Sequence, residues 1–155
     1  MITQLGAERL LQLLDSQANL WVGLARACPS VSDTRAHEPK AASYSRKWVS
    51  GNRNSAGDPK KWGEIQRDGN GAKRTTDLTI YFNEAYDNVL GAVEDWGELR
   101  YVCLFLSETG DDLFAFQELP EPIHPGANNQ SSIALIRSGD LTIEIGNPAP
   151  AATNE

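Results

Sequence analysis

The sequence contains few of the residues that build metal centres, disulfide frameworks or catalytic dyads. Its 155 residues include two cysteines, Cys28 and Cys103, and two histidines, His37 and His124. The cysteines lie far apart and have no Cys or His neighbour at metal-ligand spacing, so neither a disulfide scaffold nor a zinc site is indicated. We expect both to be buried thiols, and we expect no metal and no cofactor.

The sequence also lacks a long apolar run and a secretory leader. The apolar stretch at residues 101–106 is too short to span a bilayer. Residues 1–8 carry neither a basic segment nor the apolar core that a signal peptide needs. We therefore expect a protein that is made and assembled in a cytoplasm and has no membrane partner.

Acidic residues outnumber basic ones, and the two kinds are separated along the chain. The formal net charge is −7, from 21 Asp+Glu and 14 Lys+Arg. Ten of the basic residues and four acids lie between Arg35 and Arg74, so this segment carries +6 and the remainder −13. A basic segment on an acidic body indicates nucleic acid or an acidic protein surface as partner. The acidic remainder of a second copy of the chain would provide such a surface.

Residues 95–106 indicate the central strand of the fold. After a turn formed by Asp95-Trp96-Gly97, both alternating sets of side chains are largely apolar. A strand that is apolar on both faces must be covered on both faces. Trp96 is expected to pack in the core.

The N-terminus predicts a short amphipathic helix. Thr3 is a suitable N-cap, and the leucines of residues 10–14 follow at helical spacing until the helix ends near Asp15. This helix either closes one end of the core or is an arm that docks on a partner subunit, through Leu10 and Leu14.

The rest of the chain reads as short strands separated by Gly and Pro turns. Strands are expected at residues 20–24, 43–49, 75–82, 99–106, 113–119, 133–136 and 141–145. We expect hairpins through residues 108–111 and 137–140, a break at Pro120 and Pro122, and a short helix or loop at 86–93.

This pattern predicts an all-β fold, an antiparallel β-sandwich or jelly roll with a short N-terminal helix. The expected organisation is an arm at residues 1–18 and one β-sandwich domain at 19–147. That domain would carry a long basic loop at about 50–74, and a disordered tail would follow at 148–155.

No pattern of catalytic residues stands out. His37 and His124 lie in proline-bearing loops, and the acidic pairs Glu94-Asp95 and Asp111-Asp112 occupy expected turns, where Asp is favoured for backbone hydrogen bonds. The segment at 68–71 (DGNG) lacks the remaining ligands of a calcium loop and the third glycine of a dinucleotide site. We expect no enzymatic activity.

The candidate contacts with partners lie in the helix and the basic segment. They are Leu10, Leu14, Arg46, Lys47, Trp48, Arg53, Lys60, Lys61, Trp62 and Arg67. Basic residues interleaved with Trp48 and Trp62 are also typical of single-strand nucleic-acid binders, a reading that the pI of about 4.8 disfavours. Exposed indoles at the same two positions would alternatively stack on sugars.

Several motifs, in this order, resemble a family of small tailed-bacteriophage virion proteins, often labelled tail-fibre or virion structural proteins. They are LWVGL at 20–24, Glu38, YSR at 44–46, LTIYFNEA at 78–85, DWG at 95–97, LF at 104–105, LFA at 113–115 and GDLTI at 139–143. The chain departs from the family at residues 41–46, in the basic loop and at 86–93.

The resemblance implies a β-sandwich subunit that assembles on a phage particle, without catalysis or cofactor. The expected function is therefore a structural component of the virion, either capsid decoration (cement) or a tail, baseplate or fibre subunit. We expect a homo-oligomer, with a trimer preferred, that contacts other virion proteins. The alternative is a carbohydrate-binding receptor-recognition module, an adhesin, on the virion.

Overall fold

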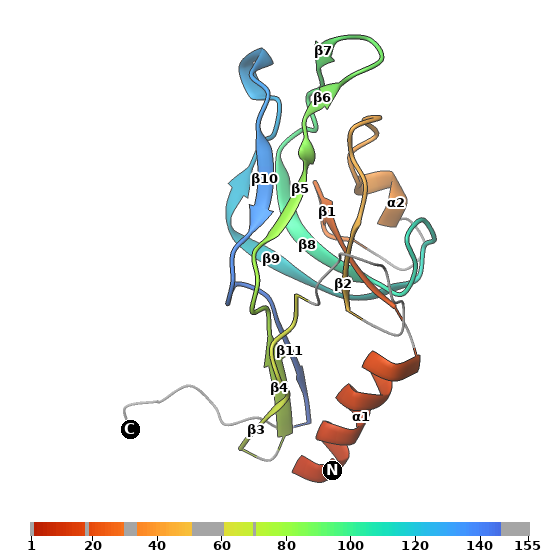
Figure 1. The fold of residues 1–155 in the computed structure, drawn as a ribbon, viewed down its shortest axis with the longest axis vertical. Coiled ribbons are helices and arrows are strands. Elements are labelled where there is room, and N and C mark those ends of the chain that lie inside the picture. The colour runs from red at the N-terminus through yellow and green to blue at the C-terminus, as the bar shows by residue number, and fades with distance from the viewer. Residues whose placement is uncertain (1, 18, 30–33, 51–60, 70, 147–155) are drawn as a thin grey trace. The chain divides into compact units, whose positions relative to one another are not determined.

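The computed structural model describes residues 2–17, 19–29, 34–50, 61–69 and 71–146. Most of their regular structure is antiparallel β-sheet, with one long helix at the N-terminus (Figure 1). The predicted fold class is confirmed: all-β and sandwich-like with an N-terminal helix.

The chain forms two compact units, where an N-terminal arm and one β-sandwich domain were predicted. Unit 1 contains Met1–Asn19, Ser50–Ile80 and Ile136–Glu155, and unit 2 contains Leu20–Val49 and Tyr81–Leu135. Each unit is therefore assembled from segments that are distant in the sequence.

In unit 1, the helix α1 (Gln4–Gln17) packs on a three-stranded sheet. The strands are β3 (Gln66–Asp68), β4 (Gly71–Thr75) and β11 (Thr142–Ile145), in the order β11-β4-β3. The Thr3 hydroxyl accepts a hydrogen bond from the Gly6 N–H at 3.0 Å, so Thr3 caps the helix as predicted. Ala7 and Leu11 are buried, and the helix contacts β4 and β11.

The segment predicted as a long basic loop is in part a β-hairpin. Asp68 pairs with Gly71 at the turn, and β3 pairs with β4 as far as Gln66↔Lys73. Gly69 has a φ of 57°, which glycine adopts without strain. The prediction of a loop was wrong here because Asp-Gly between two strands favours a hairpin turn. Residues 51–60 lie outside the described residues.

The two C-terminal strands do not pair with each other, which corrects the predicted hairpin. The strand β10 (Ile133–Ile136) pairs with β5 (Ile80–Glu84), and β11 pairs with β4. Thr76 holds the connection between them: its Oγ1 accepts from the N–H of Gly139 at 3.2 Å and of Leu141 at 3.3 Å. Because these donors bond to Thr76, the turn does not close a hairpin and the two strands separate.

In unit 2, four strands form the main sheet in the order β2-β1-β8-β9. They are β2 (Lys47–Ser50), β1 (Leu20–Ala25), β8 (Leu99–Phe105) and β9 (Leu113–Ile123). The strand β8 pairs with β1 on one side and with β9 on the other, so the predicted central strand is confirmed. β1 is buried on both faces.

The strand β9 continues through Pro120 and Pro122, where a break was predicted. Between the pairs Leu99↔Ile123 and Tyr101↔Glu118, β8 advances two residues while β9 advances five, which marks a bulge. Pro120 and Pro122 lie within this bulge of an edge strand, a position where proline is tolerated.

Unit 2 also contains several shorter elements. They are the helix α2 (Thr34–His37), the paired strands β6 (Tyr86–Asp87) and β7 (Ala92–Val93), and the 3-10 turn η1 (Ala127–Asn129). The expected strand at 75–82 is divided between β4 and β5, and residues 86–93 form neither the helix nor the loop that was expected. Cys103 is buried as predicted, but Cys28 is exposed.

Candidate functional site

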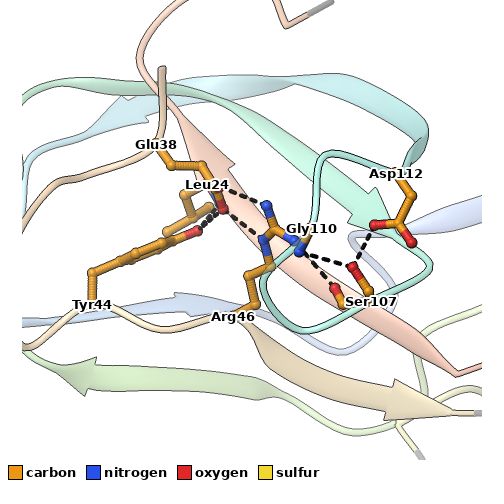
Figure 2. A network of polar contacts seen from close by, with 7 residues as sticks. All are labelled: Leu24, Glu38, Tyr44, Arg46, Ser107, Gly110 and Asp112. Carbon is orange, nitrogen blue, oxygen red and sulfur yellow. Dashed lines mark hydrogen bonds and ion pairs between the residues drawn. The ribbon is translucent and has the colours of Figure 1, made fainter. Parts of the chain in front are cut away.

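A buried ion pair between Glu38 and Arg46 lies on one face of the main sheet of unit 2. Arg46 Nε donates to Glu38 Oε1 at 2.9 Å, and Nη2 donates to Oε2 at 2.7 Å (Figure 2). The two side chains are 3% and 8% exposed. The guanidinium also lies 3.4 Å from the centre of the Phe105 ring. This bidentate geometry, with an aromatic ring beneath it, suits arginine and not lysine.

Tyr44 extends the network to the backbone of β1. Its hydroxyl donates to Glu38 Oε1 at 2.7 Å and accepts from the Leu24 N–H at 3.0 Å. Burial, and then the negative charge of Glu38, raises the pKa of Tyr44 well above its usual value. A Cβ at Gly23 would come within 2.8 Å of both Glu38 Oε1 and the Tyr44 hydroxyl, so glycine leaves the space that the network occupies.

The same arginine fixes the turn between β8 and β9. Arg46 Nη1 donates to the Ser107 carbonyl at 3.1 Å. The Ser107 hydroxyl accepts from the Gly110 N–H at 2.9 Å and donates to Asp112 at 2.5 Å (Figure 2). The network therefore joins the segment before β2, strand β1 and the β8–β9 turn.

A cleft of about 540 Å³ opens beside this network. Its lining includes Arg35, Lys40, Tyr44, Arg46 and Glu108. Arg46 and Glu38 satisfy each other's charge, and the raised pKa of Tyr44 is the opposite of what an activated nucleophile requires. These groups therefore bond to one another and hold three segments of unit 2 together.

A second cleft, of about 520 Å³, contains the acidic pair Glu94-Asp95 and His124. His124 Nε2 lies 2.5 Å from Asp95 Oδ1, and both side chains are exposed. Glu94 accepts from the N–H groups of Ala42 at 3.0 Å and Ser43 at 2.8 Å. The carboxylates of Glu94 and Asp95 therefore bond to loop residues and hold these loops in place.

Hydrogen bonds to these two carboxylates predict a dependence of stability on pH. The Ser43 side chain, with the N–H groups of Ser43 and Ala42, lowers the pKa of Glu94 below its usual 4.5. The Gly97 N–H and then His124 lower the pKa of Asp95 below 3.8. A lowered folded-state pKa means that the stabilisation is complete above the unfolded-state value and is lost as pH falls through the folded-state value.

We therefore expect the melting temperature to fall as the pH drops below about 4.5, and to fall less steeply in Glu94→Gln. Thermal unfolding followed by circular dichroism from neutral to acid pH would measure this. Glu121→Gln removes an exposed carboxylate that has no bond to Ser43, and is the matched control. If the melting temperatures of wild type and Glu94→Gln fell equally steeply at acid pH, the attribution of this stabilisation to Glu94 would be contradicted.

Neither cleft combines a nucleophile with a positioned base among the described residues. His124 bonds to Asp95, and the Ser43 hydroxyl accepts from Trp96 Nε1 at 2.9 Å. The described part of the chain contains no group of three or more His, Cys, Asp or Glu residues placed to hold a metal ion. No helix in it is both long and apolar enough to cross a membrane.

Three of the predicted contact residues are buried within single units, which corrects the expectation that they lie on the surface. Arg46 is in the ion pair, Trp48 is 8% exposed in a core cluster with Trp21 and Phe105, and Trp62 is 5% exposed. Aromatic residues next to basic ones had indicated a surface. The tertiary fold instead buries the rings and pairs Arg46 with Glu38.

The other predicted contact residues are at or near the surface, or fall outside the described residues. Leu10 and Arg67 are exposed, Leu14, Lys47 and Lys61 are half-buried, and Arg53 and Lys60 lie outside the described residues. Arg67 pairs with Glu8 at 2.5 Å, and Lys47 Nζ donates to Asn83 Oδ1 at 2.5 Å. The structure does not bring this set together at one site, and its role in contacts stays a prediction.

Sequence reasoning missed the exposed apolar side chains of unit 2. They are Tyr81, Val89, Leu90, Leu106, Phe114, Phe116, Ile133 and Leu135. One signal was available, because Val89-Leu90 stands in a turn between Asn88 and Gly91, where polar residues are usual.

Comparison with protein-family models, with curated proteins and with solved structures finds no match to this chain.

Proposed function

We propose that this chain is a non-enzymatic structural component of a tailed-bacteriophage virion that assembles through protein–protein contacts. It would serve as capsid decoration or cement, or as a tail, baseplate or fibre subunit. It would be assembled in the host cytoplasm as a homo-oligomer, with a trimer preferred. The order of motifs from LWVGL at 20–24 to GDLTI at 139–143 supports the phage assignment.

The observation that carries the assembly role is the amount of apolar side chain exposed on unit 2. Val89 and Leu90 are 92% and 79% exposed, and Tyr81 is 63% exposed. Isolated exposed apolar residues are normal, but several on neighbouring strands are typical of interaction surfaces. A subunit that assembles would cover them.

The arrangement of charged groups supports a structural role for the two clefts. Glu38 is bonded to Arg46 and Tyr44, and Glu94 to the backbone of Ala42 and Ser43. Such internal bonds hold loops in place, and loops decide what a structural subunit contacts. The adhesin alternative depended on exposed Trp48 and Trp62, and the burial of both rings removes its platform for stacking on sugars.

We expect the full chain to self-associate and to bind particles that lack it. Light scattering and sedimentation at increasing protein and salt concentration would measure assembly, which should weaken with salt if charged surfaces contribute. Co-sedimentation with particles from a deletion strain would test binding to virion partners. A strictly monomeric chain without affinity for such particles would contradict the proposal.

A further inference from the structure

The cleft beside the Glu38–Arg46 ion pair differs in charge between its floor and its rim. The floor contains Glu38 and Arg46, which are buried and compensate each other's charge. The rim contains Arg35, Lys40 and Glu108, which are exposed. Small-molecule sites in proteins have volumes of about 300–1,000 Å³, and this cleft has about 540 Å³. The cleft therefore has room for a small ligand, and its charged groups indicate the kind of ligand.

Arg35 and Lys40 are two basic residues whose side chains have no partner among the described residues. Unit 2 contains six Lys+Arg and twelve Asp+Glu, a net charge of −6. The other four basic residues of this unit all have partners: Arg26, Arg46, Lys47 and Arg100. Both unpaired cations thus line one cleft of an acidic unit. Because two like charges there repel each other, an anion between them would be attracted to both.

Arg46 adds buried hydrogen-bond donors at the floor of the same cleft. A guanidinium has five N–H donors. Arg46 uses three of them, two for the oxygens of Glu38 and one for the Ser107 carbonyl (Figure 2). The other two N–H groups have no acceptor among the described residues, although the side chain is only 3% exposed. Since a buried N–H without an acceptor is costly, these two groups favour a ligand that brings oxygen acceptors.

We propose that this cleft binds an oxyanion, either a carboxylate or a phosphate group. Arg35 and Lys40 would contact it from the rim, and the two remaining N–H groups of Arg46 would contact it from the floor. Guanidinium and ammonium groups bind the oxygens of carboxylates and phosphates through charge-assisted hydrogen bonds. Glu108 carries the same charge as the ligand and would limit its affinity.

Titration of the full chain with inorganic phosphate and, separately, with succinate tests the site and distinguishes the two groups. Backbone amide shifts in NMR spectra would report binding. The ionic strength is held constant with sodium chloride, because salt screens exposed charges. We expect saturable shifts at residues 35–46 and 107–110 with at least one of the two anions.

Charge variants separate binding in the cleft from the general effect of net charge. Arg35→Gln with Lys40→Gln should weaken binding by about tenfold or more, because two charge-assisted contacts are lost. Glu108→Gln should strengthen it by about two- to fivefold, because a like charge leaves the rim. Arg9→Gln with Arg100→Gln removes two exposed arginines that do not line the cleft, and is the matched control. It should leave the dissociation constant unchanged.

The outcomes either support or overturn the site. Saturable binding that weakens in the cleft variant but not in the control supports it, and the anion that binds identifies the group. Binding that the cleft variant does not weaken, or that the control weakens equally, overturns the site, as does the absence of saturable binding of either anion. The titration measures an anion on the chain alone, so its failure would leave the proposed assembly function standing.

Discussion

Replacing Arg46 by methionine is expected to lower the free energy of unfolding by about 3–5 kcal/mol. Methionine fills part of the space over the Phe105 ring but leaves the Glu38 carboxylate buried without its cation. A buried charge that has lost its partner keeps its full desolvation penalty. The Ser107 carbonyl also loses its donor, so we expect faster amide exchange in residues 107–112.

Chemical denaturation followed by tryptophan fluorescence would measure the loss, with Arg100→Met as the matched control. Arg100 pairs with Glu98 at 2.5 Å on the surface, where such pairs contribute about 0–1 kcal/mol. In the double variant Glu38→Gln with Arg46→Met, the free energy of unfolding should fall by less than the sum of the two single-variant losses, because neither partner is left charged. Equal losses in Arg46→Met and Arg100→Met would show that the Glu38 pair is not buried in solution.

Replacing Trp96 by alanine should lower the free energy of unfolding by about 3–5 kcal/mol. Trp96 is among the largest fully buried side chains of unit 2. Its ring meets Tyr44 edge-on, with centroids 5.3 Å apart, and its Nε1 donates to the Ser43 hydroxyl at 2.9 Å. Alanine would leave a cavity next to the Glu38 network, and the Ser43 hydroxyl would lose the donor that Trp96 Nε1 provides.

Trp96→Phe separates packing from hydrogen bonding, since phenylalanine keeps most of the ring but has no donor. We expect a smaller loss than in Trp96→Ala, measured by thermal and urea unfolding of the three proteins. An unchanged midpoint in Trp96→Ala would mean that the indole is not packed in solution. A loss in Trp96→Phe as large as in Trp96→Ala would place the main contribution in the bond to Ser43.

The strength of local patterns decided which parts of the fold could be predicted. The two apolar faces of residues 99–105 require cover on both sides, and β8 is central. Thr3 and the leucine spacing predicted the capped helix α1. The pairing of β10 and β11 could not be predicted in this way, because the turn at 137–140 is compatible with a hairpin until Thr76, more than 60 residues earlier, bonds to it.

The candidate site was less predictable than the fold. Glu38 and Arg46 are eight residues apart in a region without regular periodicity, so their pairing over Phe105 has no local signal. Trp48 and Trp62 were placed on the surface because basic residues surround them, yet both rings are buried. The exposed positions Val89 and Leu90 were overlooked because apolar residues are normally assigned to the core.

The sequence by itself determined the all-β class, the central strand at residues 99–105 and the uneven distribution of charge along the chain. These follow from alternation, apolar content and residue counts, which are local properties. Only the tertiary structure decided that the chain forms two units, that Arg46 is buried against Glu38, and that Arg35 and Lys40 line one cleft. Such arrangements depend on contacts between segments far apart in the chain, and no local pattern encodes them.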